Sequence, residues 1–206
     1  MTISSLATAG GTLVLAGATF SAVRSSNRSA RVAERSLMAG LRPLLMPSRP
    51  DDPPQKVGFA DGRWLRVPGG GGAAEQADGA VYLAMSVRNA GSGIAVLHGW
   101  RFTRDPQSGT EPAPPLEEFE RLTRDLYVPA GDVGFWQGVI RDPERPEVRE
   151  VAAAIEGRER IVVDVLYGDH EGGQRVVSRF SLMPTTDGGW IAAAARHWNI
   201  DRDDPR

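Results

Sequence analysis

Three histidines, His98, His170 and His197, are the residue type best suited to proton transfer or metal binding in this chain. They are far apart in the sequence and show neither H-x-H nor H-x-x-x-H spacing, so a shared site would have to be assembled by folding. Alternation places His98 on the face of Val96 and Trp100, which predicts a core histidine. His170 lies in a glycine-rich turn and is expected to be exposed. A hydrolase or ligand-binding domain that uses His98 and His197 is the alternative function.

The other motifs predict loops, turns and solvated surface and not catalytic or ligand-binding sites. The chain has no cysteine, which excludes disulfides, thiolate metal sites and cysteine nucleophiles. The run Gly69–Gly72 lacks the Gly-Lys-Ser/Thr ending of a phosphate loop and is expected to be a flexible loop. Gly91-Ser92-Gly93 predicts a turn, and the acidic run at 117–120 predicts a solvated surface. We therefore expect no catalytic residue, no cofactor and no bound metal.

Aromatic side chains are the better candidates for contact with a partner. The chain has five tryptophans, and core packing accounts for most of them. Trp64 lies in a short, charged strand and is expected to be exposed. Phe119 and His170 are the further candidate partner-binding residues.

Charge is distributed unevenly along the chain. It carries 24 basic and 26 acidic residues, a net charge of −2 that argues against a general nucleic-acid binder. The first 50 residues contain six arginines and one glutamate, whereas residues 51–206 contain 18 basic and 25 acidic residues. The basic N-terminal part therefore needs a local explanation.

The first 23 residues carry no charged side chain, which predicts a transmembrane helix over 1–23. A helix over residues 3–23 is about 30 Å long, the thickness of the hydrocarbon core. The arginines that follow it predict an outer N-terminus and a cytoplasmic main domain at the cell membrane. A buried soluble helix and a cleaved signal peptide are the alternatives.

Four arginines, Arg24, Arg28, Arg31 and Arg35, follow at helical spacing and predict a basic juxtamembrane helix over 24–41. They form a stripe that can contact anionic lipid headgroups, and the alternative is a topology signal on a solvated face. Pairs of small residues, Ala7/Gly11 and Ala18/Ala22, would allow a parallel homodimer.

The remaining residues, 42–200, predict a mainly β domain, and residues 201–206 predict a flexible tail. Pro43 should end the long helix near residue 41. Runs 81–88 and 94–102 are expected to pair as a hairpin, 133–140 to be a central strand, and 104–115 to be mobile. Two helices are expected, at 115–122 and 146–156. The other expected strands are 41–47, 56–59, 63–67, 161–167, 176–182 and 190–200.

The fold class that fits these elements is an immunoglobulin-like antiparallel β-sandwich with two short helices, preceded by the long N-terminal helix. A small closed barrel is the alternative. The order of an uncharged helix, an arginine-bearing helix, the entry Leu41-Arg42-Pro43-Leu44 and the segment 87–95 (VRNAGSGIA) resembles uncharacterised single-pass bacterial membrane proteins. The resemblance implies topology and fold and carries no activity. The sequence thus predicts a membrane-anchored, non-enzymatic module that binds an unidentified protein.

Overall fold

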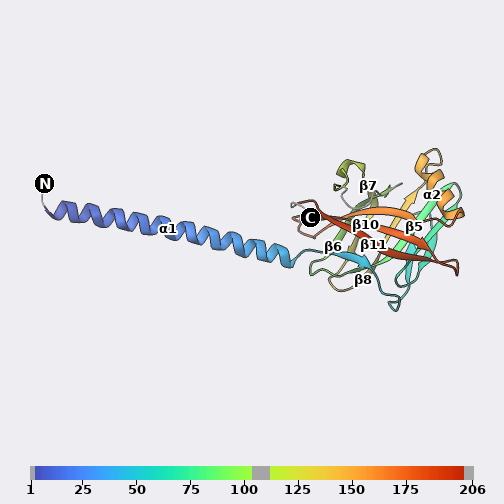
Figure 1. The fold of residues 1–206 in the computed structure, drawn as a ribbon, viewed down its shortest axis with the longest axis horizontal. Coiled ribbons are helices and arrows are strands. Elements are labelled where there is room, and N and C mark those ends of the chain that lie inside the picture. Colours follow the sequence, from blue (N-terminus) through green and yellow to red (C-terminus); the bar gives the residue numbers. More distant parts are fainter. Residues whose placement is uncertain (1–2, 104–111, 202–206) are drawn as a thin grey trace. The chain divides into compact units, whose positions relative to one another are not determined.

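The chain consists of two compact units, residues 1–40 and residues 41–206. The computed structural model describes the backbone of residues 3–103 and 112–201, and the side chains of the N-terminal helix from residue 17 onward, except at 18, 35 and 39 (Figure 1). The predicted loop 104–115 and tail 201–206 lie largely outside this described part.

The first unit is a single helix, α1 (Ile3–Gly40), of 38 residues. It ends at the expected place, three residues before Pro43, whose ring cannot continue a helix. Among the described residues, no helix combines the length and apolarity needed to cross a membrane.

The second unit is mainly β, as expected. Its helical parts are a 3₁₀ turn, η1 (Leu116–Glu118), and one α-helix, α2 (Pro146–Glu156), which begins with proline at its first turn. The strands are β1 (Leu45–Pro47), β2 (Gln55–Gly58), β3 (Trp64–Val67), β4 (Gly71–Ala77), β5 (Ala80–Asn89), β6 (Ala95–Thr103), β7 (Glu120–Val128), β8 (Val133–Ile140), β9 (Ile161–Gly168), β10 (Arg175–Pro184) and β11 (Trp190–Asn199).

Nine of the described strands form one antiparallel sheet in the order β1-β5-β4-β11-β10-β9-β6-β7, with β8 on the other edge of β5. The sheet curls so that its two end strands, β7 and β8, come together. The guanidinium of Arg124 on β7 donates to Gln137 Oε1 on β8 at 3.1 Å. Strand 133–140 was expected to be central, but β5 is its one ladder partner among the described strands. Its faces are both apolar because Trp136 packs in the main core and Phe135 also packs against the hairpin β2–β3.

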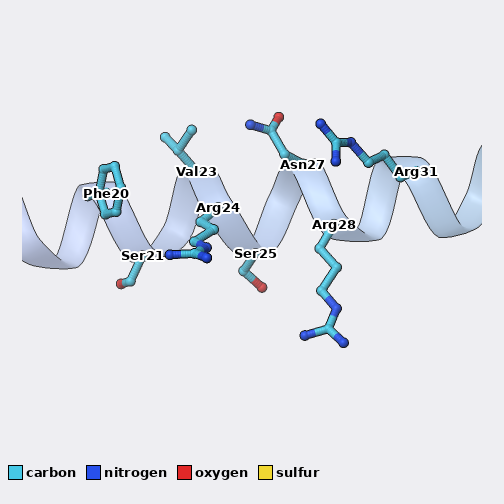
Figure 2. Close-up of a pocket in the computed structure, with 8 residues that line it drawn as sticks. All are labelled: Phe20, Ser21, Val23, Arg24, Ser25, Asn27, Arg28 and Arg31. Atoms are coloured by element: carbon cyan, nitrogen blue, oxygen red, sulfur yellow. The ribbon is translucent and has the colours of Figure 1, made fainter.

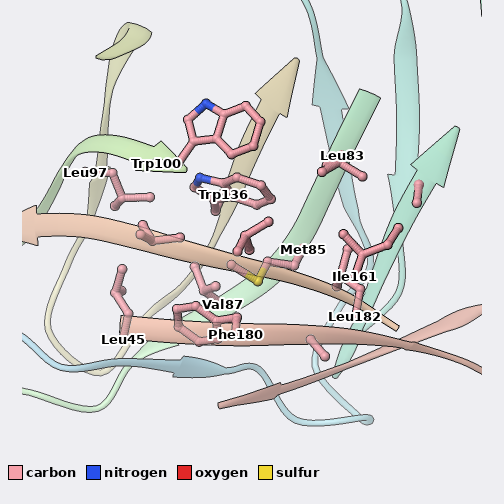
Figure 3. Close-up of a cluster of buried hydrophobic side chains, with 14 of the residues drawn as sticks. Leu45, Leu83, Met85, Val87, Leu97, Trp100, Trp136, Ile161, Phe180 and Leu182 are labelled. Atoms are coloured by element: carbon pink, nitrogen blue, oxygen red, sulfur yellow. The ribbon is translucent and has the colours of Figure 1, made fainter. Parts of the chain in front are cut away.

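The main core lies inside the curl (Figure 3). Alternate residues of β5 point into it, as the pattern predicts, together with inward residues of β9 and β10. The indoles of Trp100 and Trp136 meet edge to face, with their centroids 5.3 Å apart. Fully buried members include Leu83, Met85, Val87, Ile161, Phe180 and Leu182.

A second, smaller core forms on the outer face of β5. The hairpin β2–β3 lies over Tyr82 and Ala84 and buries Val57 and Leu65 against them. Phe59 packs edge to face on Tyr82 at 5.1 Å. The predicted short hairpin is confirmed, and it forms an additional layer on the large sheet.

The predicted pairing of 81–88 with 94–102 is wrong. Strand β5 pairs with β1, β4 and β8, whereas β6 pairs with β7 and β9. The connection is bonded to other segments instead: Ala90 N donates to Leu44 O at 2.7 Å, and the Asn89 amide donates to Val128 O at 3.0 Å. Asn89 thereby holds the connection against the end of β7.

The predicted core position of His98 is also wrong. The register of β6 shifts between Leu97 and Gly99, which is a β-bulge. A bulge changes which residues face inward, so Ala95 and Leu97 face the core before it and Trp100 after it. His98 is therefore exposed.

The helix predicted over 115–122 is reduced to the single turn η1, and β7 begins at Glu120. The acidic and basic pairs that favour a helix there are overridden by pairing with β6, where Arg121 lies opposite Gly99.

The predicted flexible loop Gly69–Gly72 is instead closely packed at the start of β4. A Cβ on Gly72 would lie 2.5 Å from Leu182 Cδ2, and a Cβ on Gly71 would lie 2.9 Å from Trp190 O. These glycines let β4 approach β10 and β11, which is a use of glycine that composition alone does not reveal.

Candidate functional site

The best candidate site on the β-domain is the exposed face of the β2–β3 hairpin. Alternation along the two strands buries Val57 and Leu65 and leaves Lys56, Trp64 and Arg66 outside. We call these three residues the hairpin face. The Trp64 side chain is 59% exposed, in agreement with the sequence prediction.

The indole of Trp64 is held in place by its neighbours. It lies across Gly58, its partner on β2, where a Cβ would be only 2.8 Å from the ring. The Lys56 Nζ lies 4.7 Å from the ring centroid, in cation–π contact. Beside the ring is an open hollow of about 460 Å³, lined by Pro54, Gln55, Lys56, Trp64, Leu65 and Arg66.

The hairpin face is basic, and its charges are not neutralised within the described part of the chain. Lys56 and Arg66 lie directly opposite each other, a pairing of like charges that destabilises a sheet. Neither has a carboxylate partner among the described residues. Arg63 on the same hairpin, by contrast, pairs with Glu75 at 3.5 Å and Asp78 at 3.2 Å.

A serine–histidine contact is the arrangement closest to a catalytic one. Ser178 Oγ lies 2.6 Å from His197 Nδ1 and 2.8 Å from the Tyr167 hydroxyl, which accepts a bond from Leu45 N at 3.1 Å. Ser178 is fully buried, and burial raises the pKa of Tyr167 to about 12. This chain of bonds connects β1, β9, β10 and β11 and leaves the Ser178 hydroxyl no access to a substrate.

His98 belongs to a different group of side chains. Desolvation lowers its pKa, and the charged groups that act on it are Asp125, Arg175 and Asp169. Within residues 3–103 and 112–201, no three His, Asp or Glu side chains are placed to hold a metal ion. Among the described residues, one His–Ser contact supports the hydrolase alternative, and no group of metal ligands does.

A buried ion-pair network, missed by sequence reasoning, spans the outer face of β6, β9 and β10. Asp164 is fully buried and accepts from Arg179 Nε at 2.7 Å and from Arg101 Nε at 2.9 Å. Thr103 Oγ1 donates to the same carboxylate at 3.0 Å, and Arg101 also pairs with Glu118. The carboxylate is saturated with donors, which fits a structural role.

The predicted membrane-surface arginines lie on α1. Figure 2 shows Arg24, Arg28 and Arg31 leaving the ribbon in different directions, on the turns that follow Phe20 and Val23. All are exposed, and the side chain of Arg35 lies outside the described residues. These residues all come from one helix, so they line an open surface and not an enclosed cavity.

The two other predicted partner-binding residues lie at separate places. The ring of Phe119 is half-buried, with the Arg101 guanidinium 5.9 Å from its centroid. His170 is exposed in the β9–β10 turn, as expected, and its Nε2 lies 3.1 Å from Glu171 Oε1. Neither shows the combination of exposed ring and unpaired charge found on the hairpin face.

Comparison of the chain with protein-family models, curated proteins and solved structures found no match.

Proposed function

We propose that this protein is a membrane-anchored, non-enzymatic interaction module. In this proposal α1 holds the chain at the cell membrane as a single-pass anchor with the N-terminus outside. The β-domain, which we assign to the immunoglobulin-like sandwich class, lies on the cytoplasmic side and binds a protein partner. A parallel homodimer through α1 belongs to the same proposal.

The observation that carries the proposal is the charge pattern of α1, in which an uncharged segment ending at residue 23 is followed by Arg24, Arg28 and Arg31. Phe20 and Val23, at the end of the uncharged segment, are 69% and 54% exposed, although side chains of this kind are usually buried. The uncharged first 23 residues and the arginines that follow them favour a bilayer as the environment of the N-terminal part. The arginines would then lie at the anionic cytoplasmic surface.

Binding, and not catalysis, is favoured for the β-domain by the state of its polar residues. Ser178 and Asp164 are buried and bonded within the fold, whereas Trp64 and His170 are exposed. Residues that must react with a substrate need access to it. Residues that contact a protein partner or a membrane surface must be exposed, as Trp64 and His170 are.

Proximity labelling from the C-terminus of the full chain tests this proposal. We expect the labelled proteins to be cytoplasmic proteins that act at the membrane, and Phe119→Ala or His170→Ala to reduce the labelling of a specific subset of them. Tyr127→Ala, which removes a ring that is 59% exposed on β7, is the matched control. Labelling confined to extracytoplasmic proteins would contradict the proposed topology.

The alternative, a membrane-tethered hydrolase, is favoured only by the contact between Ser178 and His197. A fluorophosphonate probe, which labels activated serines, separates the two functions. We expect no labelling that depends on Ser178. Labelling that Ser178→Ala abolishes would favour the hydrolase.

A further inference from the structure

We propose that the hairpin face docks the β-domain on an anionic lipid surface. The inference rests on the proposed anchoring by α1 and assigns Lys56, Trp64 and Arg66 to contact with the bilayer itself. Other surfaces of the domain then remain available to a protein partner.

The aromatic part of the hairpin face suits the membrane interface. Tryptophan is enriched there because its ring is apolar and its N–H is polar. The Trp64 indole is fixed against Gly58 and by Lys56, so little side-chain freedom is lost when it enters the headgroup region. The ring is nevertheless 59% exposed and available for contact.

The charged part of the hairpin face lacks a neutralising group. Lys56 and Arg66 are opposed across the hairpin, and neither has a carboxylate partner in the described part of the chain. Anionic headgroups would relieve this repulsion. Two cations beside one indole thus form a small basic and aromatic surface of the kind that binds acidic lipids.

The charge of the rest of the domain makes this face selective. Residues 51–206 carry 18 basic and 25 acidic residues, so most orientations of the domain are repelled by an anionic bilayer. The exposed, acid-free hairpin face is attracted to it. The domain should therefore approach the surface in a preferred orientation.

The open shape of the hollow favours lipid over a defined peptide. The residues around its roughly 460 Å³ supply one side-chain amide, Gln55, and two cations, Lys56 and Arg66. A specific ligand needs several converging hydrogen-bonding groups, whereas headgroups need charge and an interfacial ring. Such binding is weak alone, but tethering converts it to an intramolecular event at millimolar effective concentration.

A labelled full chain reconstituted in vesicles tests the inference. The chain has no native cysteine, so Pro54→Cys at the rim of the hollow can carry a single fluorophore. Vesicles of phosphatidylcholine, with or without about one-third phosphatidylserine, contain headgroup-nitroxide quenchers. We expect strong quenching at position 54 only with phosphatidylserine, and little at Glu171→Cys, whose native side chain is 62% exposed in the β9–β10 turn.

Charge variants identify the residues responsible. The double variant Lys56→Gln/Arg66→Gln should lower the docking equilibrium constant roughly tenfold or more. For the wild-type chain, 0.5 M salt should also lower this constant, because salt screens the attraction to the headgroups. The matched variant Arg149→Gln/Arg160→Gln changes two exposed arginines away from the hairpin and should leave quenching unchanged.

The outcomes separate the inference from the anchor. A chain that stays on the vesicles without lipid-dependent quenching at position 54 overturns the inference alone. A chain that does not stay on the vesicles overturns the anchoring on which it rests. Protection of position 54 only after addition of a cytosolic protein extract would assign the hairpin face to a protein and overturn the lipid assignment.

Discussion

At the scale of single residues, Asp164 is the buried carboxylate that joins three strands. Arg179 and Arg101 both donate to it, and Arg179 is itself only 4% exposed. Removing one member of such a pair leaves a buried charge without compensation, which costs far more than loss of a surface ion pair.

Asp164→Ala should therefore lower the free energy of unfolding by about 3–5 kcal/mol in denaturant titrations. The matched control is Glu75→Gln, which removes a carboxylate that is 52% exposed and 3.5 Å from Arg63. Its effect should be about 0–1 kcal/mol. Equal losses in the two variants would contradict the structural role of Asp164.

Tyr167 makes folding stability depend on alkaline pH. Its folded pKa is raised to about 12 by burial, from an ordinary value near 10. The unfolded chain thus releases this proton first, and the stabilisation present below pH 10 is lost as pH rises towards 12.

Tyr167→Phe should be less stable at pH 8, because Ser178 and Leu45 lose a hydrogen-bond partner, but should lose less stability between pH 10 and 12. Tyr127→Phe, at an exposed ring, should retain the wild-type pH dependence. Denaturant titrations across this pH range measure both. Identical alkaline losses in wild type and Tyr167→Phe would refute the assignment.

Residue-scale prediction from sequence worked where burial follows strand alternation. The exposure of Trp64 follows from its own strand, so it could be foreseen. The burial of Asp164 could not, because its arginine partners lie 15 and 63 residues away and are brought together by strand pairing. The exposure of His98 depends on a β-bulge beside Gly99, and a glycine within a strand is the local sequence signal of such a bulge.

At the scale of elements, the strongly alternating strands and α2 were predictable, whereas β4 was not. Its glycine and alanine residues give no alternating apolar pattern, and their role appears only once β10 and β11 are beside them.

Gly72→Val should consequently destabilise the domain by about 1–3 kcal/mol, because the added side chain overlaps Leu182 and the backbone of β5. Gly17→Ala, in the exposed helix, meets nothing within 4 Å and should be neutral or stabilising. Thermal unfolding measures both changes. If Gly72→Val leaves thermal stability unchanged, residues 69–72 form a flexible loop, as the sequence predicts.

For α1, the membrane proposal distinguishes two exposed valines. Val23→Glu should reduce membrane retention of the full chain severalfold, because a carboxylate would have to enter the hydrocarbon boundary. Val32→Glu has a similar native exposure, 57% against 54%, but lies beyond the first arginines and should be tolerated. Membrane fractionation with immunoblotting compares them. Equal loss in both variants would argue for a protein partner along the whole helix.

At the scale of the whole molecule, the sequence predicted a mainly β domain but not its strand topology. Strands adjacent in sequence, such as β5 and β6, do not pair, and β6 lies between β7 and β9. The uneven charge of the chain, in contrast, is visible in the sequence alone. It links a basic, helical N-terminal unit to an acidic β-domain and is the basis of the membrane proposal.

The most direct test of the membrane proposal is carbonate extraction of the full chain from cell membranes. Alkaline carbonate releases peripheral proteins and leaves bilayer-spanning ones in the pellet. We predict that the wild-type chain stays in the pellet. Complete recovery of the chain in the carbonate supernatant would contradict the anchor and, with it, the proposed function.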